Sequence, residues 1–203
     1  MKKEFLPYDI VRDNALKLAA RIYHDGFVPD IIYVSLRGGA YLGNVISEYF
    51  KIVNRRDHPV YYAAVVARSY TDVRNSSEEI KVEGWTYAPE HLRTGDKVLF
   101  VDDIFDTGRT INHLAEIILA KCIPREDLKI AVHDYKYFYD KPHQLPIQPD
   151  YWCRRQDLSV NDEERWIHYM SHELVGLSAH ELEEYYYKRD DELRNALSVL
   201  DPS

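Results

Sequence analysis

The sequence predicts an α/β fold, in which helices flank a twisted and mainly parallel sheet. Short apolar runs that indicate buried strands alternate with segments whose apolar residues recur at helical spacing. The strands are apolar throughout, which indicates a sheet covered on both faces. The chain has 203 residues, 45% hydrophobic and 30% charged, so it is long enough for one full core and unlike disordered or fibrous proteins.

The first elements are a helix, a strand and a second helix. Residues 8–24 carry an apolar stripe at helical spacing, and Gly26 ends the pattern. Residues 31–36 have the composition of a short buried strand. Two adjacent glycines, Gly38 and Gly39, break this strand, and a helix is predicted from there to about residue 50.

The middle of the chain continues the alternation. Residues 60–67 are predicted to be a buried strand, residues 68–79 a polar loop, and residues 80–87 a strand-like stretch. A turn at 95–96 then leads to three further elements, which are a buried strand at 97–101, a helix at about 110–121 and a strand at 128–133.

The character of the chain changes after residue 134. An aromatic-rich stretch reaches to about residue 175, and because three prolines interrupt it we expect it to be irregular. It is too short for a core of its own, so we interpret it as a cap on the edge of the sheet. Ser178 and Glu181 have the spacing of a capping box, which predicts a helix to about Leu200. The expected parts are a core at 1–134, a small hood at 135–175 and an extra acidic C-terminal helix at 176–203.

Charge and composition limit the function classes. With 26 basic and 34 acidic residues the net charge is −8, which argues against a sequence-independent nucleic-acid binder. Residues 178–203 contribute half of it, with seven acidic and three basic residues. No apolar run is long enough for a membrane span, and no apolar region follows the N-terminal lysines. Two cysteines suit a reducing compartment, so the expected location is the cytoplasm, without membrane or nucleic-acid partners.

The segment after the strand at 97–101 carries the chemistry. Asp102 and Asp103 end this strand, Asp106 follows, and Thr107–Thr110 stands where a helix is predicted to begin. Ligands of parallel sheets lie beyond the carboxyl ends of the strands, and phosphates favour backbone amides at a helix N-terminus. Residues 106–110 therefore suit a phosphate monoester. Carboxylates cannot bind a phosphate directly, so the aspartates are expected to hold hydroxyls, a metal ion or both.

Other interpretations of this segment explain less. Three aspartates within five positions after an apolar strand are unusual for a loop whose only function is to cap a helix. An Asp-x-Asp phosphatase pattern is absent, and so is the Gly-x-x-x-x-Gly-Lys-Ser/Thr loop of many nucleotide-binding proteins.

The sequence VLFVDDIFDTGRT at 98–110 resembles the phosphoribosyl-diphosphate-binding motif of type I phosphoribosyltransferases. Three other stretches agree with this resemblance, which covers residues 10–173. SLRGG at 35–39 resembles the pyrophosphate loop of the purine members, and Ser69-Tyr70 with the following polar loop resembles their flexible lid, at about 68–80. Residues 128–173 resemble the hood that binds a 6-oxopurine.

The resemblance implies a role for each motif. Asp102 and Asp103 would hold the ribose hydroxyls and Mg²⁺, with Glu173 as a further metal ligand, and Asp106 would be the catalytic proton acceptor near the purine N7. The phosphoribosyl group and its 5′-phosphate would be bound by Asp102, Asp103, Asp106, Thr107, Gly108, Arg109 and Thr110. Pyrophosphate would be bound by Leu36, Arg37, Gly38, Gly39, Ser69 and Tyr70, with a cis peptide between Leu36 and Arg37. The base would be bound by Lys136 at its six-position oxygen, Trp166 by stacking, and Ile167.

One segment departs from the family pattern. Members often carry an aromatic-Pro-Trp-acid run after the stacking residue, whereas residues 167–173 read IHYMSHE. Either His172 or Glu173 stands at the acidic position.

The function implied is purine salvage, in which a homo-oligomer (dimer or tetramer) transfers a phosphoribosyl group from phosphoribosyl diphosphate to a 6-oxopurine, releasing pyrophosphate. Two alternatives stay open. One is a phosphoribosyltransferase-like regulator that binds the diphosphate as a signal and contacts nucleic acid. The other is an enzyme of the same fold with another acceptor, such as adenine, orotate or uracil.

Overall fold

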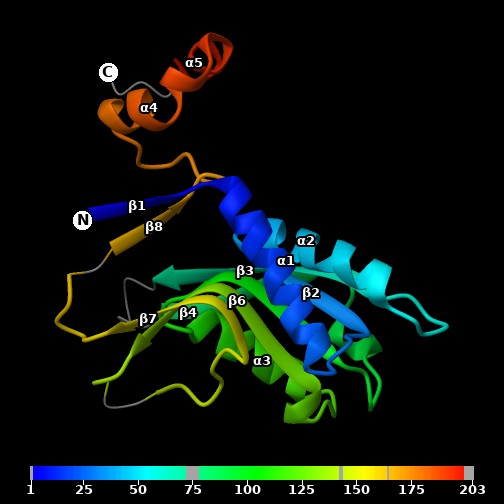
Figure 1. Cartoon of the computed structure of the whole chain (residues 1–203). Coiled ribbons are helices and arrows are strands. Elements are labelled where there is room, and N and C mark those ends of the chain that lie inside the picture. The colour runs from blue at the N-terminus through cyan, green and yellow to red at the C-terminus, as the bar shows by residue number, and fades with distance from the viewer. Residues whose placement is uncertain (1, 72–77, 142–143, 164, 199–203) are drawn as a thin grey trace.

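The computed structural model describes residues 2–71, 78–141, 144–163 and 165–198, and its centre is a six-stranded sheet (Figure 1). The strand order is β4-β3-β2-β5-β6-β7, and all neighbours are parallel except the antiparallel pair β3 and β4. The predicted mainly parallel sheet is therefore confirmed. The strands are β2 (Ile31–Leu36), β3 (Tyr61–Thr71), β4 (Glu78–Trp85), β5 (Val98–Phe105), β6 (Leu128–Phe138) and β7 (Tyr151–Leu158).

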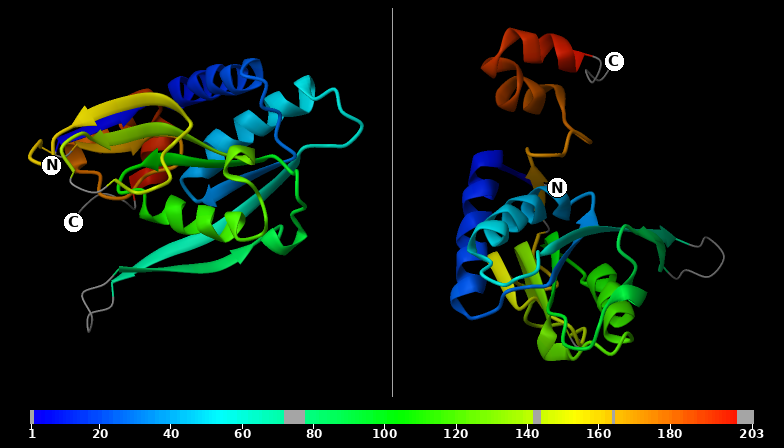
Figure 2. Two further views of the ribbon diagram at one scale, coloured as in Figure 1. Left: turned by 90° about the horizontal axis from the view of Figure 1, so that it is seen from below. Right: turned by 90° about the vertical axis from the view of Figure 1, so that its right-hand side faces the viewer.

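Helices cover both faces of this sheet, as Figures 1 and 2 show. α1 (Tyr8–His24) and α2 (Gly39–Val53) pack on one face, and α3 (Arg109–Leu119) packs on the other. Successive residues of a strand point to opposite faces. Ile31 of β2 accordingly packs in the cluster that contains α3, and its neighbour Ile32 in the cluster that contains α1 and α2. No helix in the described part of the chain is long and apolar enough to cross a membrane.

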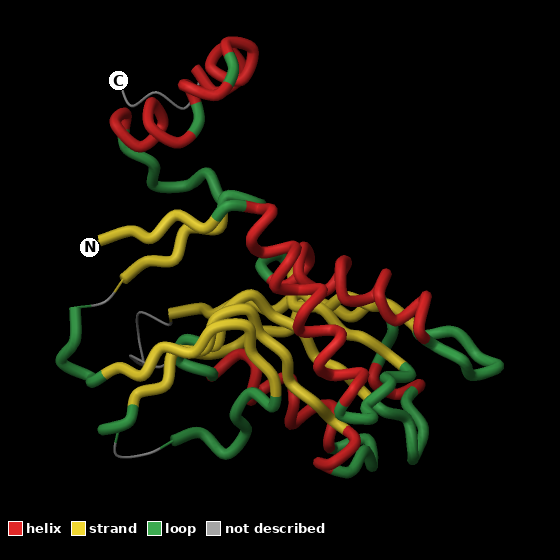
Figure 3. Tube along the Cα trace, in the orientation of Figure 1, coloured by secondary structure: helices red, strands yellow, loops and turns green. Residues whose placement is uncertain are grey.

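A second, two-stranded sheet lies apart from the first and carries the C-terminal helices (Figure 3). Its strands are β1 (Lys2–Leu6) and β8 (Arg165–Tyr169), which pair in parallel. The sequence pattern missed both strands. The expectation of an irregular stretch after residue 134 is wrong at β7 and β8, because their charged residues conceal the strand pattern: β7 is an edge strand of the large sheet, and β8 has only one partner.

The C-terminal segment forms two short helices instead of the single helix expected at 176–203. The predicted capping box of Ser178 and Glu181 is present and begins α4 (Ala179–Tyr185). α4 ends at Tyr185, and a 3-10 turn follows. The carboxylate of Asp190 then accepts the backbone N–H of Glu192 at 2.7 Å and so begins α5 (Asp191–Leu197). The described residues also contain short 3-10 turns at Pro89–His91, Arg125–Asp127 and Tyr187–Arg189.

The polar segment expected as a loop is largely a strand ribbon. β3 continues through Thr71 and β4 begins at Glu78, so the two strands pair well beyond the predicted apolar run. Part of the expected lid at 68–80, namely residues 72–77, lies outside the described residues. Ser69 and Tyr70 belong to β3 and pair with Ile80 and Glu79 of β4.

A buried asparagine joins the start of α3 to the connection between β6 and β7. The Asn112 amide nitrogen donates to the carbonyl oxygens of Gly108 at 3.0 Å and Ile147 at 2.8 Å. Its carbonyl oxygen accepts the N–H of Ile147 at 3.0 Å. With 5% of its surface exposed, Asn112 pairs the backbone N–H and carbonyl groups of Ile147 where water is excluded.

Replacing Asn112 with alanine should lower the free energy of unfolding by about 1–3 kcal/mol, because buried backbone groups lose their partners. Urea denaturation followed by circular dichroism measures the change. Asn44, an exposed residue of α2, is the matched control, and its replacement by alanine should change stability by less than about 0.5 kcal/mol. Equal effects of the two substitutions would contradict the bridging role.

Candidate active site

The candidate site lies where β2 and β5 end side by side. The turn after β2 packs directly on the end of β5, and its Leu36–Arg37 peptide is cis, as the resemblance implies. A Cβ atom on Gly39 would lie 2.6 Å from the carbonyl oxygen of Val101 and 2.9 Å from Cα of Asp102. One on Gly38 would lie within 2.4 Å of the Asp103 carboxylate. The two glycines therefore allow the turn to reach the acidic pair.

A cavity of about 280 Å³ opens beside this contact. Gly108 precedes α3 in the left-handed conformation, with φ of 75°, and a Cβ atom there would lie 2.2 Å from the Phe105 ring. Only glycine meets both requirements without strain. The first amides of a helix have no partner within it, so the loop before α3 offers donors to an anion. The cavity is lined by Ser35, Ala67, Asp102, Asp103, Ile104, Asp106, Thr107, Gly108, Arg109, Thr110 and Ile111.

The two adjacent carboxylates of Asp102 and Asp103 lie close together in a partly buried site. Burial raises the pKa of Asp102 well above its usual range, and the neighbouring Asp103 carboxylate raises it further. The backbone N–H of Asp103 donates to Asp102 Oδ1 at 3.0 Å, and that of Ile104 to Asp103 Oδ1 at 2.9 Å. In the described part of the chain, no lysine or arginine forms an ion pair with either carboxylate. A bound cation would relieve their repulsion.

The oxygen donors of this pair fit Mg²⁺, which prefers carboxylates, waters and substrate phosphates. The described residues contain no cluster of three or more histidine, cysteine, aspartate or glutamate side chains suited to hold a metal. Asp102 and Asp103 would thus supply only part of a coordination shell. The other oxygen ligands of Mg²⁺ would come from water and from a bound substrate.

Asp106, which lines this cavity, also contacts Lys136. Lys136 lies on β6 with only 5% of its side chain exposed, and its Nζ is 3.1 Å from Asp106 Oδ2. A second cavity of about 300 Å³ adjoins this pair and is lined by Asp106 and Thr107 together with the apolar side chains of Phe138, Leu158 and Val160. The sequence motif and the predicted base-binding lysine are therefore neighbours in space.

Trp166 and Ile167 point to opposite sides of β8. Ile167 is buried in a cluster with Leu6 and Val11, whereas Trp166 is 49% exposed and lines neither of the two cavities. Arg37 is also exposed to solvent. The structure therefore brings Lys136, but not Trp166, into contact with the residues of the motif.

His172, and not Glu173, faces the acidic pair. The Nε2 atom of His172 is 3.5 Å from Asp103 Oδ2. The Glu173 carboxylate instead accepts the N–H of Tyr169 at 3.1 Å and lies 3.5 Å from Nδ1 of His168. Of the two residues that the sequence left open for the acidic position, the histidine is the one that meets Asp103.

A buried polar network that sequence reasoning missed supports Asp103 from behind. The Tyr169 hydroxyl lies 3.1 Å from the Asp103 carbonyl oxygen and 2.6 Å from Asp134 Oδ2. Arg154 donates to the other oxygen of Asp134 at 2.7 Å, and His133 contacts the carboxylate at 2.7 Å. Burial alone would raise the pKa of Asp134, but these partners lower it. The sequence signal for this network was the polar pair His133–Asp134, which follows the apolar residues 130–132 of β6.

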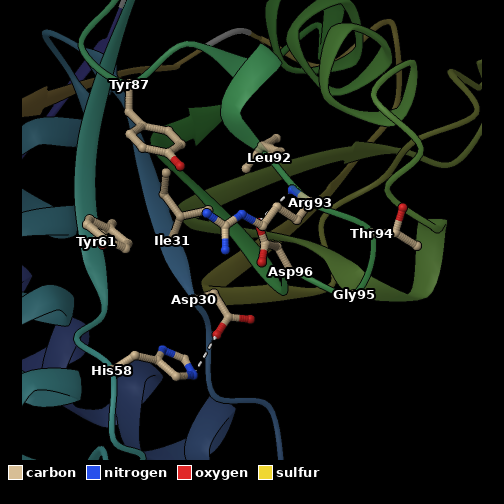
Figure 4. A pocket seen from close by; sticks show the side chains of 10 residues that line it. All are labelled: Asp30, Ile31, His58, Tyr61, Tyr87, Leu92, Arg93, Thr94, Gly95 and Asp96. Carbon is tan, nitrogen blue, oxygen red and sulfur yellow. Dashed lines mark hydrogen bonds and ion pairs between the residues drawn. The ribbon is translucent and has the colours of Figure 1, made fainter.

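Another cavity, of about 510 Å³, lies at the opposite end of the parallel strands, where β2 begins (Figure 4). Tyr61, Tyr87 and Arg93 line it, and none of the predicted site residues does. Its Asp30 carboxylate already pairs with Arg56 at 2.7 Å and accepts the N–H of Lys97 at 2.7 Å. Parallel sheets bind ligands at the carboxyl ends of their strands, so the cavity beside Asp102 is the candidate site.

Comparison with known proteins agrees with this geometry. A family model described as "phosphoribosyl transferase domain" matches residues 4–164. The chain therefore belongs to the phosphoribosyltransferase family, and its fold is that of the type I, purine-like members.

The sequence identity to individual relatives is low. The chain is 31% identical over 151 residues to the bifunctional protein PyrR of Halalkalibacterium halodurans, a match covering 70% of this chain and 79% of that protein. It is 29% identical over 122 residues to the hypoxanthine-guanine phosphoribosyltransferase of Cricetulus griseus, covering 58% of this chain and 55% of that enzyme. The crystal structure of a purine phosphoribosyltransferase from Pyrococcus horikoshii superposes with a TM-score of 0.64 at 21% identity, over 88% of this chain and 99% of that one.

Gly39→Ala should disturb the site more than any glycine substitution in open space, because its Cβ meets backbone atoms that cannot rotate away. We expect a loss of about 1–3 kcal/mol in the free energy of unfolding, as for overpacked sites. Thermal and urea unfolding measure it. The control is Gly84→Ala in β4, where an added Cβ meets nothing within 4 Å. A Gly39→Ala variant as stable as Gly84→Ala would refute the close contact.

Proposed function

We propose that the protein transfers the phosphoribosyl group of phosphoribosyl diphosphate to a 6-oxopurine base, giving a nucleoside monophosphate and pyrophosphate. The observation that carries the proposal is the 3.1 Å contact between Lys136 on β6 and Asp106 of the phosphoribosyl-binding motif. It puts a buried ammonium group beside the carboxylate proposed to act on the base. The family match and the likeness to purine enzymes support the same reading.

The residues at and after the end of β5 would each bind a different part of the substrate. Residues 106–110 would bind the 5′-phosphate, with the hydroxyls of Thr107 and Thr110 and the amides before α3 as donors. Asp102 and Asp103 would hold the ribose hydroxyls and Mg²⁺. When bound, Mg²⁺ neutralises charge on the pyrophosphate and makes it a better leaving group. The amides of the turn at 36–39, which packs on the same two aspartates, would bind the pyrophosphate.

Charge develops on the ribose ring as the bond to pyrophosphate breaks, as in other glycosyl transfers. The carboxylates of Asp102 and Asp103, which would hold the ribose, would stabilise that positive charge. Asp106 would accept the proton that leaves N7 as the purine attacks. In this scheme Asp106 exchanges its contact with Lys136 for one with the base, and Lys136 turns to the six-position oxygen.

Base selectivity tests this proposal directly. Lys136 has three N–H donors and no acceptor, so it suits the six-position oxygen of hypoxanthine, guanine or xanthine and not the amino group of adenine. We expect turnover with at least one 6-oxopurine, and a kcat/KM for adenine lower by about 10⁴–10⁵. Spectrophotometric assays of a panel of bases with phosphoribosyl diphosphate and Mg²⁺ measure both.

Lys136→Ala should erode this preference, whereas Lys141→Ala, which removes the same charge from the wall of the adjoining cavity, should not. If adenine is used as well as hypoxanthine, Lys136 does not read the base. Turnover with orotate or uracil alone would assign the chain to another acceptor.

Asp106 should affect turnover more than substrate binding. A positioned proton acceptor contributes about 10²–10⁴-fold to rate, so Asp106→Asn should lower kcat by that factor while binding of phosphoribosyl diphosphate, measured by calorimetry, changes little. Asp157→Asn, at an exposed position of β7, is the control. Near wild-type turnover of the Asp106→Asn variant would remove this residue from the chemistry.

A second function is favoured by one observation, the match to a protein named as bifunctional over 79% of its length. The chain would then bind phosphoribosyl diphosphate as a signal and contact nucleic acid. The net charge of −8 argues against that contact. An electrophoretic shift with RNA or DNA, without turnover of any base, would establish this function in place of salvage. The expected homo-oligomer and cytoplasmic location stay predictions.

A further inference from the structure

The turn between β8 and α4 carries the residue that faces the acidic pair. His172 packs its ring parallel to that of Tyr169, with centroids 5.5 Å apart and planes 16° from parallel. The turn is closed by the backbone bonds from His172 and Glu173 N–H to the Tyr169 carbonyl oxygen, at 3.2 and 2.9 Å. The direction in which His172 points therefore depends on how this turn is held.

The C-terminal helices hold the turn from its other side. The hydroxyl of Tyr186, a residue only 6% exposed, lies 3.1 Å from Nε2 of His168 and 3.4 Å from the carbonyl oxygen of Glu173. The other ring nitrogen of His168 faces the Glu173 carboxylate at 3.5 Å. That carboxylate accepts the Tyr169 N–H. Tyr186 thus contacts both ends of the hydrogen-bonded segment 168–173, which contains His172.

α4 itself is fixed to β1 through two side-chain contacts. Lys3 pairs with Glu181 at 2.8 Å and also donates to the carbonyl oxygen of Gly176. Phe5 stacks on Tyr185 with ring centroids 3.8 Å apart. The position of Tyr186 relative to β8 is therefore set by the strand that pairs with β8.

We propose that Tyr186 is a positioning residue, and that the acidic C-terminal segment serves to hold His172 against Asp103. The chain of contacts is continuous from α4 through the 169–173 turn to the carboxyl end of β5. His172 in turn restrains the Asp103 carboxylate, which has no lysine or arginine partner in the described chain. The catalytic consequence rests on the proposed function, but the positioning itself does not.

The first test measures the turn directly. Hydrogen exchange of a peptide spanning 168–173 should become about three- to tenfold faster in Tyr186→Phe, which loses one hydroxyl and its bonds. Tyr187→Phe is the matched control, because that hydroxyl belongs to the same buried cluster and donates to Leu197 O at 3.3 Å, away from the turn. Unchanged exchange in Tyr186→Phe, or equal acceleration in Tyr187→Phe, would overturn the proposal. If Tyr186→Phe does not fold, Lys3→Gln loosens α4 at the surface and should accelerate the same peptide.

The second test is a double-mutant cycle with His172→Ala. Tyr186→Phe should raise the KM for phosphoribosyl diphosphate by about three- to tenfold with little change in kcat. Tyr186→Phe should raise KM no further in the His172→Ala background, because Tyr186 acts on the site only through His172. Additive effects would contradict positioning of His172. If the wild-type chain turns over no base at all, the proposed function fails, and the exchange experiment still decides whether Tyr186 holds the turn.

Discussion

The contact between Gly39 and the end of β5 is the constraint on which the site depends. The turn after β2 runs so close to Val101 and Asp102 that even one added methyl group would clash with backbone atoms. Because β2 and β5 are parallel neighbours, their carboxyl ends lie on the same side of the sheet. The Gly39 contact joins the turn that follows β2 to the carboxyl-terminal part of β5. The amides proposed to bind pyrophosphate and the carboxylates proposed to hold ribose are thereby fixed relative to each other.

The charges and hydrogen-bond donors around the cavity determine which ligand groups each part of the site suits. Asp102 and Asp103 bring two carboxylates together in the lining of a cavity. His172 faces the Asp103 carboxylate, and Tyr169, held by the buried Asp134 network, donates to the Asp103 carbonyl oxygen. A neighbouring helix start supplies donors for an anion. The site is thus divided into an acidic half suited to a cation and hydroxyls, and an amide-rich half suited to a phosphate. The proposed substrate, a phosphorylated sugar bound with Mg²⁺, would satisfy both halves at once.

The sequence predicted the elements whose two faces are buried. β2, the first half of β5 and the first half of β6 are mostly apolar. The glycines after β2 mark its end, whereas β5 continues past Asp102 and Asp103 to Phe105, and β6 continues past Asp134 to Phe138, beyond the predicted ends at 101 and 133. The sequence could not predict β1, β7 or β8, because strands with few partners or one exposed face carry charged residues at their open positions. The Asp134 network was equally hidden, since its members come from strands far apart in the chain. The division of the expected C-terminal helix was also not predicted: α4 ends at Tyr185, and Asp190 begins α5 as a local cap.

The central claim is that the loop at 106–110 binds the 5′-phosphate. A crystal structure with phosphoribosyl diphosphate and Mg²⁺ tests it most directly. We predict that the 5′-phosphate lies within hydrogen-bond distance of the Thr107 and Thr110 hydroxyls and of amides between Asp106 and Thr110, with the ribose against Asp102 and Asp103. A 5′-phosphate that contacts none of residues 106–110 would contradict the account. One example would be a phosphate bound beside Arg93, at the opposite end of the parallel strands.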